Sequence, residues 1–441
     1  MQRGSMTKDG KPLPYRHSAP RNSRHNKHRK PKKQVSEDEE SEDSPVEEQP
    51  QEEQQRSPSP MQEEPTVRLP EEVLKALYKT PGVLMIAGLV SWDLVARRDN
   101  NPTKRTHPNL YTFHKFTDRK YRFIASSCSA GHSVLVDEHG EVYTFGRNTC
   151  GQLGFGDTVT RNVPEPVPAL RGKNIIHAAV GRHHTLFVTD TGTVYACGDN
   201  KCGQCGIGNT TPQVLKPTRV RYRQALRGAP VVKVGCGAEF SMILDCNGAL
   251  HSFGLPEYGQ LGHNTDGKYF VTSTKLSFHF ETVPKHVAHF FEKTKEGHIN
   301  IVKDYFESQS RGVRSVHCGG TYSLAVNELG GLFLFGQTKR TGEANMYPKP
   351  VQDLSGNVGT SNTSIVIAAD DSLVAWGVSP TYGELGTGDI NKSSARPKEV
   401  TRMDGLNITQ VTMGYSHTLL LCDDAGEEVK AKLASMPTFN P

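Results

Sequence analysis

The sequence predicts an all-β fold, a β-propeller of six counted repeats that follows a disordered N-terminal segment. Two short sequence elements alternate along most of the chain, and both are apolar, β-prone runs set between glycine-rich turns. Residues 1–72 lack the apolar side chains that a core requires. With 441 residues, 42 glycines and only 35% hydrophobic residues, the chain suits a repeat architecture of many short strands.

The first repeated element ends in a glycine that follows an aromatic residue or a cysteine. Its clearest copies are Gly140–Gly146, Gly192–Gly198 and Gly248–Gly254, and each is followed by four residues and a Gly-Gln-x-Gly turn. Weaker copies end at Gly336 and Gly377. Glycine tolerates the positive φ angles of tight turns, so we interpret Gly-Gln-x-Gly as turn chemistry rather than as a binding motif.

The second element has a histidine or another residue in one slot, then Ser or Thr, then three apolar residues. The residues in this slot are His132, His184, Phe240, Tyr322, Thr363 and His417. Because the runs show no helical periodicity, they predict strands of antiparallel meanders, with fully apolar centres buried on both faces. One small sheet cannot bury both faces alone, so the sheets must stack, and radial stacking gives a propeller.

The two ends of the repeat region are incomplete repeats. The strand predicted at Gly82–Gly88 ends in a closing glycine but has no slot element before it. The last unit, which ends near Leu421, has a slot element but no closing-glycine element after it. We therefore expect N- and C-terminal strands to pair in one blade and close the ring. The predicted propeller covers 73–426, a short helix across 70–79 leads into it, and 427–441 form a C-terminal tail.

The N-terminal segment has two halves of opposite charge. Residues 1–35 carry eleven Lys or Arg, and residues 36–72 carry fourteen Asp or Glu. Such a segment cannot offset its chain entropy, so we expect 1–72 to be disordered. A predicted nuclear localisation or chromatin-contact cluster comprises Arg21, Arg24, Lys27, Arg29, Lys30, Lys32 and Lys33. Candidate sites for proline-directed phosphorylation are Ser44, Ser57 and Ser59.

The two alternating elements together resemble the regulator of chromosome condensation repeat, over roughly residues 82–426. The family resemblance implies seven blades, whereas the closing glycines number six: Gly88, Gly146, Gly198, Gly254, Gly336 and Gly377. Relative to the family, about one blade is missing between Ile301 and Arg311, and Asn357–Asn362 replaces an expected strand. The chain is then either a six-bladed variant or an incomplete form of a seven-bladed one.

The resemblance also implies a function. It implies a binding and regulatory propeller that acts on small GTPases of the Rac, Ral or Arf class and associates with chromosomes, centromeres, microtubules and the mitotic spindle midzone. The implied location is the nucleus, nucleolus or chromosome, with some cytoplasmic protein. Two alternatives stay open: guanine nucleotide exchange, or a chromatin or microtubule scaffold that sequesters GTPases without exchange. We expect no cofactor and no covalent catalysis, because the sequence has no phosphate-binding loop motif and no catalytic cluster.

The resemblance places contact with the GTPase in one segment between the slot residues Phe240 and Tyr322. Its residues are Leu276, Ser277, Phe278, His279, Phe280, Glu281, Thr282 and Val283. A loop that exposes Phe278, Phe280 and also Phe290 is typical of an interface. The alternative is an ordinary strand extension with half of its residues buried.

Basic residues gather in two further segments. The predicted basic surface comprises Arg97, Arg98, Lys104, Arg105, Lys115, Arg119, Lys120 and Arg122, from an insert at 97–122, together with Arg219, Arg221 and Arg223. On a strand the last three would share one face. They are candidates to contact phosphates, an acidic tubulin tail or an acidic GTPase surface, or else they are solvated edge charges.

Two other patterns have structural interpretations. We expect the histidines of the repeat slot, His132, His184 and His417, to be buried and to tie one strand to the next through one ring nitrogen, since Phe240 and Tyr322 replace them elsewhere. Cys202 and Cys205 have the spacing of a metal knuckle, but Cys205 occupies the Leu position of a Gly-Gln-Leu-Gly turn and no second pair follows, so we expect no metal.

Composition excludes several classes of protein. The longest apolar run, Val83–Val90, is far shorter than the roughly 20 residues of a spanning helix. No N-terminal secretory signal is expected. Nine scattered cysteines indicate reduced thiols rather than a disulfide framework.

Overall fold

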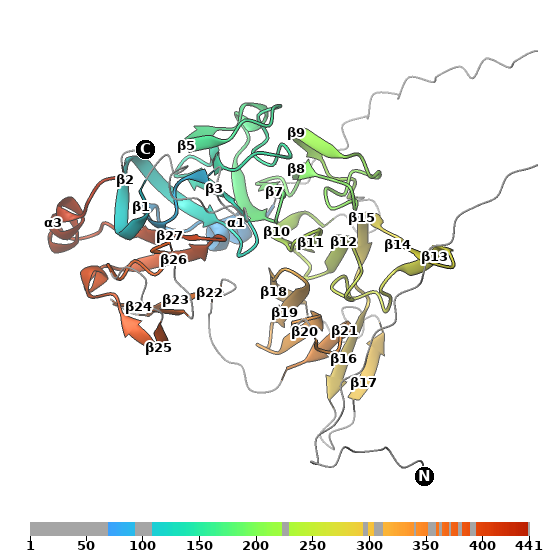
Figure 1. The fold of residues 1–441 in the computed structure, drawn as a ribbon. Coiled ribbons are helices and arrows are strands. Elements are labelled where there is room, and N and C mark those ends of the chain that lie inside the picture. The colour runs from blue at the N-terminus through green and yellow to red at the C-terminus, as the bar shows by residue number, and fades with distance from the viewer. Residues whose placement is uncertain are drawn as a thin grey trace, which may run out of the picture. The chain divides into compact units, whose positions relative to one another are not determined.

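The computed structural model confirms an all-β propeller fold (Figure 1). It describes residues 69–92, 108–222, 229–293, 299–303, 312–338, 341–351, 359–360, 364–369, 372–377, 382–388 and 394–439. The predicted basic cluster of 21–33, the three Ser-Pro sites and Arg97, Arg98, Lys104, Arg105 and Arg223 lie outside these residues. None of the described helices is long and apolar enough to cross a membrane.

Blades 1 and 2 share one strand and form a continuous seven-stranded sheet. In sheet order blade 1 consists of β26 (Ile408–Met413), β27 (His417–Cys422), β1 (Gly82–Gly88) and the first part of β2 (Leu110–Ala125). Blade 2 consists of the end of β2, β3 (His132–Asp137), β4 (Val142–Gly146) and β5 (Arg161–Pro166). Since β1 pairs with β27 from Val83↔Cys422 to Gly88↔His417, the prediction that N- and C-terminal strands pair in one blade is confirmed.

Four further blades each have four antiparallel strands. Blade 3 consists of β6 (Ile175–Val180), β7 (His184–Thr189), β8 (Val194–Asp199) and β9 (Gln213–Arg219). Blade 4 consists of β10 (Val231–Cys236), β11 (Phe240–Asp245), β12 (Leu250–Gly254) and β15 (Glu281–His286). Blade 5 consists of β18 (Val313–Cys318), β19 (Tyr322–Asn327), β20 (Leu332–Gly336) and β21 (Asn345–Pro350). Blade 6 consists of β22 (Gly359–Thr360), β23 (Ser364–Ala369), β24 (Ser372–Gly377) and β25 (Ser394–Glu399).

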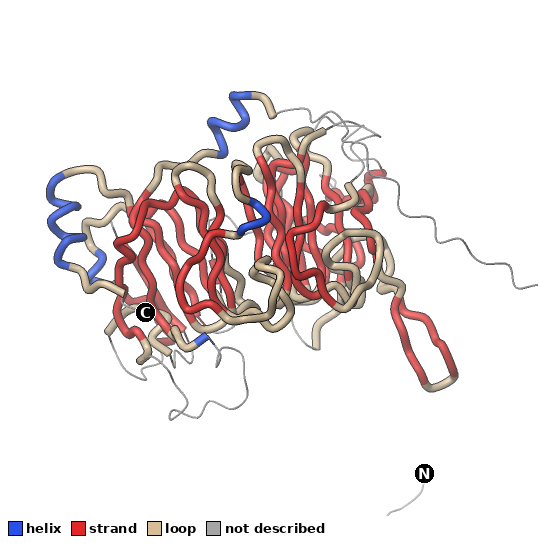
Figure 2. Tube along the Cα trace, turned by 90° about the horizontal axis from the view of Figure 1, so that it is seen from above, coloured by secondary structure: helices blue, strands red, loops and turns tan. Residues whose placement is uncertain are grey.

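Two hairpins and two helices complete the described fold. The hairpins are β13 (Lys268–Thr272) with β14 (Lys275–Phe278), and β16 (His289–Lys293) with β17 (Ile299–Lys303). The helices are α1 (Glu71–Leu77), within the predicted range 70–79, and α3 (Glu427–Ser435). Figure 2 shows α1 beyond one end of the strands.

The C-terminal segment is folded, so the prediction of a tail over 427–441 is wrong for its described part. Leu433, Met436 and Phe439 are buried, and the Phe439 ring lies 4.9 Å from the ring of Phe116 on β2. The backbone of Lys115 exchanges hydrogen bonds with Pro437 and Phe439. Apolar side chains in an otherwise charged segment thus complete the outer edge of blade 1.

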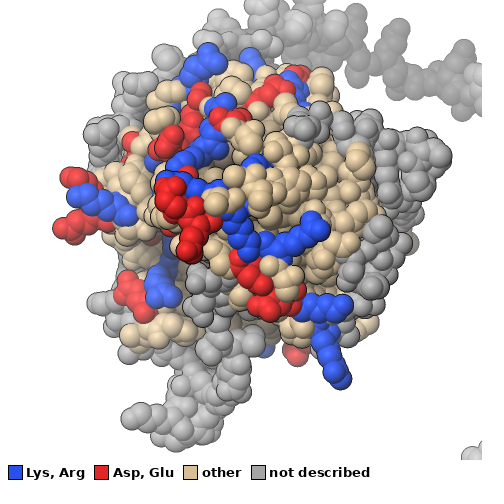
Figure 3. All heavy atoms as spheres, turned by 90° about the vertical axis from the view of Figure 1, so that its left-hand side faces the viewer, with Lys and Arg blue, Asp and Glu red and all other residues tan. Residues whose placement is uncertain are grey.

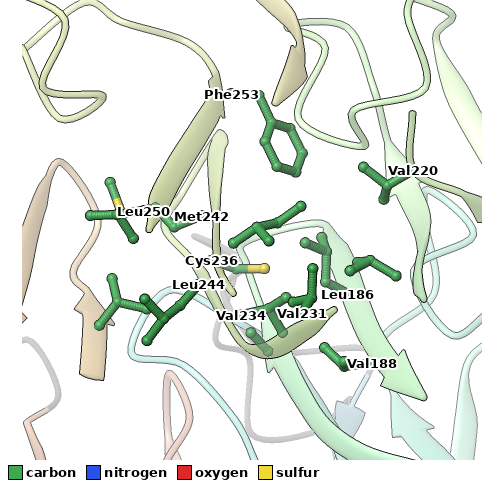
Figure 4. Close-up of a cluster of buried hydrophobic side chains, with 14 of the residues drawn as sticks. Leu186, Val188, Val220, Val231, Val234, Cys236, Met242, Leu244, Leu250 and Phe253 are labelled. Atoms are coloured by element: carbon green, nitrogen blue, oxygen red, sulfur yellow. The ribbon is translucent and has the colours of Figure 1, made fainter. Parts of the chain in front are cut away.

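The core lies between the faces of neighbouring blades, as stacked apolar sheets require. Figure 4 shows the packing of Leu186 and Val188 from blade 3 against Val234, Met242 and Leu244 from blade 4. In blades 1 to 4 the second strand is buried along its whole length.

Blades 5 and 6 are buried on alternate residues instead. On β19 the side chains of Ser323 and Ala325 are buried, whereas Leu324 and Val326 are half-buried. On β24 the half-buried side chains include that of Trp376. Each of these two blades therefore has one face in a core between blades and one face that is only partly covered.

Candidate functional site

Three buried histidines connect the first four blades, each blade with the next. Nε2 of His417 in blade 1 lies 2.9 Å from Oγ of Ser133 in blade 2. In the same way His132 lies 2.8 Å from Oγ1 of Thr185 in blade 3, and His184 lies 2.9 Å from Oγ of Ser241 in blade 4. Each of the three rings is fully buried, and its hydrogen bond joins one blade to the next rather than one strand to the next within a blade.

The hydrogen bonds of the hydroxyl groups assign the tautomer of these rings. Thr185 donates its proton to the Gln152 carbonyl at 2.7 Å, and Ser241 donates to the Gln204 carbonyl at 2.7 Å. Since each hydroxyl proton is used, Nε2–H of His132 or of His184 must be the donor to the hydroxyl oxygen. Burial lowers the pKa of His184 and of His417 to about 3, so both rings are neutral at physiological pH.

The Gly-Gln-x-Gly turns supply the other half of this connection. The carbonyl of the Gln position accepts a hydroxyl proton from the following blade at Gln152, Gln204 and Gln260, and Glu384 takes the same role between blades 6 and 1. The turn glycines have positive φ, as expected, for example +80° at Gly151. These turns are therefore structural joints. The motif recurs because each turn joins its blade to the following one.

Cys205 packs in the core between blades, as its position in the turn predicts. Burial raises the pKa of the Cys202 thiol to about 12 and that of Cys205 well above its ordinary value. The described residues contain no group of three or more His, Cys, Asp or Glu side chains arranged to hold a metal ion.

Among the described residues between Phe240 and Tyr322, the most exposed apolar surface is on the β13–β14 hairpin, which projects from blade 4 (Figures 1 and 2). Its side chains Phe270, Val271 and Leu276 are 73%, 51% and 43% exposed, and Tyr269 is exposed beside them. We call these four residues the hairpin surface. Large apolar groups concentrated on one projecting element are typical of an interface.

The base of the hairpin is fixed to the propeller. His279 donates its backbone N–H to the Gly267 carbonyl at 2.8 Å, and the His279 ring stacks on Tyr269 with centroids 4.2 Å apart. Gly267 has a φ of +66°, and a Cβ there would lie 2.5 Å from Pro256 in the turn after β12. A rigid base limits the conformational entropy that the hairpin itself would lose when a partner docks on its tip.

The predicted GTPase segment, 276–283, is divided by the fold. Leu276, Ser277 and Phe278 belong to β14, whereas Glu281, Thr282 and Val283 begin β15, the outer strand of blade 4. The Thr282 carbonyl accepts a hydrogen bond from Gly208 of blade 3, so this part holds two blades together. The expected exposure of Phe290 is wrong: the side chain is fully buried and packs edge-to-face on Phe333 at 5.3 Å.

Tyr269, Phe270 and Val271 were not among the predicted site residues. The sequence holds a signal for them, since β-prone runs on both sides of Thr272-Ser-Thr-Lys275 indicate a hairpin. Only the structure shows that no described blade packs against the second face of that hairpin.

Four described residues of the predicted basic surface lie on β2, and all four contact partners within the chain. The expected insert is in fact strand β2 from residue 110 onward. Arg122 is buried: its guanidinium bonds Asn174 and the Ile175 carbonyl and stacks on the Tyr78 ring at 4.4 Å, so its assignment to a surface is wrong. Lys115 donates to the Leu433 and Ala434 carbonyls at the end of α3.

Neighbouring acids pair with the other described basic residues of β2. Arg119 pairs with Asp118 at 3.0 Å and Lys120 pairs with Asp424 at 2.8 Å. On the side of the molecule where α3 lies in Figure 1, Figure 3 shows Lys and Arg interspersed with Asp and Glu rather than one positive patch. The strand predicted across 219–223 ends at Arg219, so Arg219 and Arg221 do not share a strand face.

Comparisons with known proteins agree with this architecture. Residues 82–420 match the model of the RCC1-like domain. The chain is 39% identical to "Protein RCC2 homolog" of Xenopus laevis, over 82% of each chain, and 39% identical to "Protein RCC2" of Homo sapiens, over 82% of this chain and 80% of the human one.

Among solved structures, Prp20p from Saccharomyces cerevisiae has a TM-score of 0.54 at 16% identity, over 84% of this chain and 98% of that one. At that identity the likeness concerns the fold alone. The fold, the joints between blades and the match over residues 82–420 lead to one conclusion: the chain belongs to the family of RCC1-like domain propellers, together with the proteins called RCC2.

Proposed function

We propose that this chain is a regulatory propeller that binds a small GTPase of the Rac, Ral or Arf class through the hairpin surface. The observation that carries the proposal is the exposure of Phe270, Val271 and Leu276 on a projecting hairpin with a fixed base. Burial of one such side chain contributes about 1.5–3 kcal/mol, so each one supplies enough for a roughly tenfold to hundredfold effect on affinity.

The propeller would act by differential binding. A chain that holds the nucleotide-free GTPase more tightly than the loaded one accelerates nucleotide release, and the coupling free energy between the two ligands sets the size of the effect. A chain that binds both states equally is a scaffold that sequesters the GTPase. We propose exchange as the activity and keep the scaffold as its measurable alternative.

The fold offers supporting context. Prp20p, which shares the propeller fold, is described as binding Gsp1p and histones. Within the described part of this chain, the repeated His, Ser or Thr and Gln positions form hydrogen bonds between blades. We therefore look to projecting segments for the surface that a partner contacts.

The test measures release of a fluorescent guanine nucleotide from Rac, Ral and Arf proteins by the full chain. Phe270→Ser with Leu276→Ser should reduce binding at least tenfold. The matched control is Leu329→Ser, because Leu329 is 69% exposed on a turn of another blade. Release that is accelerated by the wild type and the control but not by the double variant supports the proposal. Equal loss in both variants, or no binding by the wild type, contradicts it.

A contact with chromatin is a second proposal, supported by the seven Lys and Arg residues of 21–33. It would place the protein in the nucleus and on mitotic chromosomes, and we extend it to centromeres, microtubules and the spindle midzone. Binding of DNA through six or more of these charges should weaken about 10³-fold or more between 50 and 200 mM salt. GTPase binding through the hairpin surface should change much less, which separates the two surfaces in one salt series.

A further inference from the structure

The outer edge of each blade is protected against pairing with a further strand. A sheet edge presents unpaired N–H and C=O groups, and proline blunts such an edge because it has no N–H. In blade 1 the backbone of Lys115 on β2 bonds Pro437 and Phe439, so the C-terminal segment covers that edge. In blades 2 to 6 a proline occupies the same register position of the outer strand: Pro164, Pro217, Pro284, Pro348 and Pro397.

The β13–β14 hairpin has no protection of this kind. Its two strands pair only with each other, and Lys268–Thr272 contains no proline. All five side chains of β13 are exposed, and the one charged side chain among them, that of Lys268, forms an ion pair with Asp266 at 3.1 Å. The β16–β17 hairpin differs, because its Phe290 is buried against Phe333 of blade 5. Of the described outer edges, that of β13 therefore has neither a proline nor a covering segment.

The same strand carries the most exposed aromatic side chain of the hairpin surface. Phe270 pairs with Leu276 across the hairpin, so the two side chains share one face of a ribbon that projects from blade 4 (Figure 2). An isolated two-stranded ribbon is only marginally stable in water, whereas a third strand completes the backbone ladder and covers apolar side chains from the side. The edge of β13 is thus the side on which an added strand gains most.

The edge of β13 is complementary to itself. Two copies of an antiparallel edge can pair about a two-fold axis, and an axis at Phe270, the middle residue, brings all five residues of each strand into the pair. In that register Lys268 lies opposite Thr272 of the second copy, so no two like charges face each other. Phe270 lies opposite Phe270 of the second copy, and cross-strand aromatic pairs of this kind stabilise a sheet.

We propose that β13 pairs with β13 of a second copy of this chain, which gives a four-stranded sheet in the order β14-β13-β13-β14. The contact is weak and reversible, because four side chains offer less than the roughly 800 Å² per partner of a standard interface. The break in register between Phe270 and Thr272 weakens the edge further. A second copy covers Phe270, so self-pairing competes with the GTPase of the proposed function for the hairpin surface.

Single cysteines at the hairpin test the register in the full chain under mild oxidation. Phe270→Cys should give a disulfide-linked dimer, since directly opposite residues have Cα atoms about 4.5–5.5 Å apart, within the range of a disulfide. Leu276→Cys should not, because three strand spacings, about 14 Å, separate the two copies of that residue. Thr272→Cys should not either, since its two copies lie four residues apart along the pair, about 13 Å.

The wild type, whose Cys246 is exposed, measures the background of native thiols. Equal cross-linking at all three positions indicates random collision and overturns the proposal. Cross-linking at Leu276→Cys alone shows contact through the hairpin face instead of its edge, and no cross-linking above the wild type shows no contact. Both results overturn the proposal as well.

Charge exchange at the two-fold axis gives a second readout, by sedimentation of the full chain from about 1 to about 200 µM, where an interface this small should associate. Phe270→Lys and Phe270→Glu should each weaken dimerisation at least tenfold, because each places like charges opposite each other. An equimolar mixture of the two variants should dimerise again, which a merely misfolded hairpin would not do. A wild type that stays monomeric, or a mixture no more dimeric than either variant alone, refutes the pairing. These experiments contain no GTPase, so their result and that of the nucleotide-release assay are independent.

Discussion

The tight packing of a repeat glycine on a repeat histidine gives the sharpest test of the fold. A Cβ added at Gly414 would lie 1.9 Å from Cε1 of His417 and 2.5 Å from both ring nitrogens. The ring has nowhere to move, because Ser133 bonds its Nε2 and Trp92 packs edge-to-face on it with centroids 5.0 Å apart. Gly414→Ala should therefore lower the free energy of unfolding by about 3 kcal/mol, the upper range for overpacking.

A double-mutant cycle isolates this clash. His417→Ala should cost about 3 kcal/mol, since it removes a buried ring and its hydrogen bond. The double variant should also cost about 3 kcal/mol rather than the sum of about 6 kcal/mol, because the new methyl group then occupies the space of the ring. The coupling energy should be about 3 kcal/mol, measured by reversible urea unfolding followed by circular dichroism.

The control for the cycle is Gly320→Ala, because a Cβ there meets nothing within 4 Å and its backbone is not left-handed. This variant should change the free energy of unfolding by less than 1 kcal/mol. Additive effects of Gly414→Ala and His417→Ala would refute the reasoning, and so would a Gly414→Ala protein as stable as the wild type.

Three further predictions concern other parts of the fold. The pKa of about 3 for His184 and His417 lies below the usual 6.5, so these rings stay neutral in the folded state while the unfolded chain takes up protons. The free energy of unfolding should therefore fall as pH falls from about 6.5 to about 3, by up to roughly 1.4 kcal/mol per pH unit for each ring. His184→Phe should reduce that slope, as measured by urea titrations at several pH values. Lys115→Met should remove the two hydrogen bonds to the end of α3 and speed hydrogen exchange of its amides about tenfold, whereas Lys120→Met, which loses only a surface ion pair, should not. Because Trp92 is fully buried and Trp376 is half-buried, iodide should quench the emission of the Trp92→Phe variant more than that of Trp376→Phe, and equal quenching would show that the partly covered face of blade 6 is covered in solution.

The local part of this architecture could be predicted from the sequence. The recurring slot residues, the Ser or Thr that follows and the Gly-Gln-x-Gly turn predicted strands, turns and structural histidines, because each motif acts through contacts that every repeat makes. The incomplete units at Gly82–Gly88 and near Leu421 predicted the closure, since a blade needs four strands wherever they lie in the chain. In each case the same local contacts recur in several repeats, so the sequence pattern that makes them can be recognised.

Only the tertiary structure decided which side chains are free. Arg122 and Phe290 look like surface residues in a charged or loop-like context, yet the neighbouring elements bury them. Phe270 looks like a core residue of a β-prone run, yet its side chain is 73% exposed. The physical reason is that exposure depends on what packs against a residue, and in a propeller that neighbour comes from another blade, about fifty residues away in the sequence.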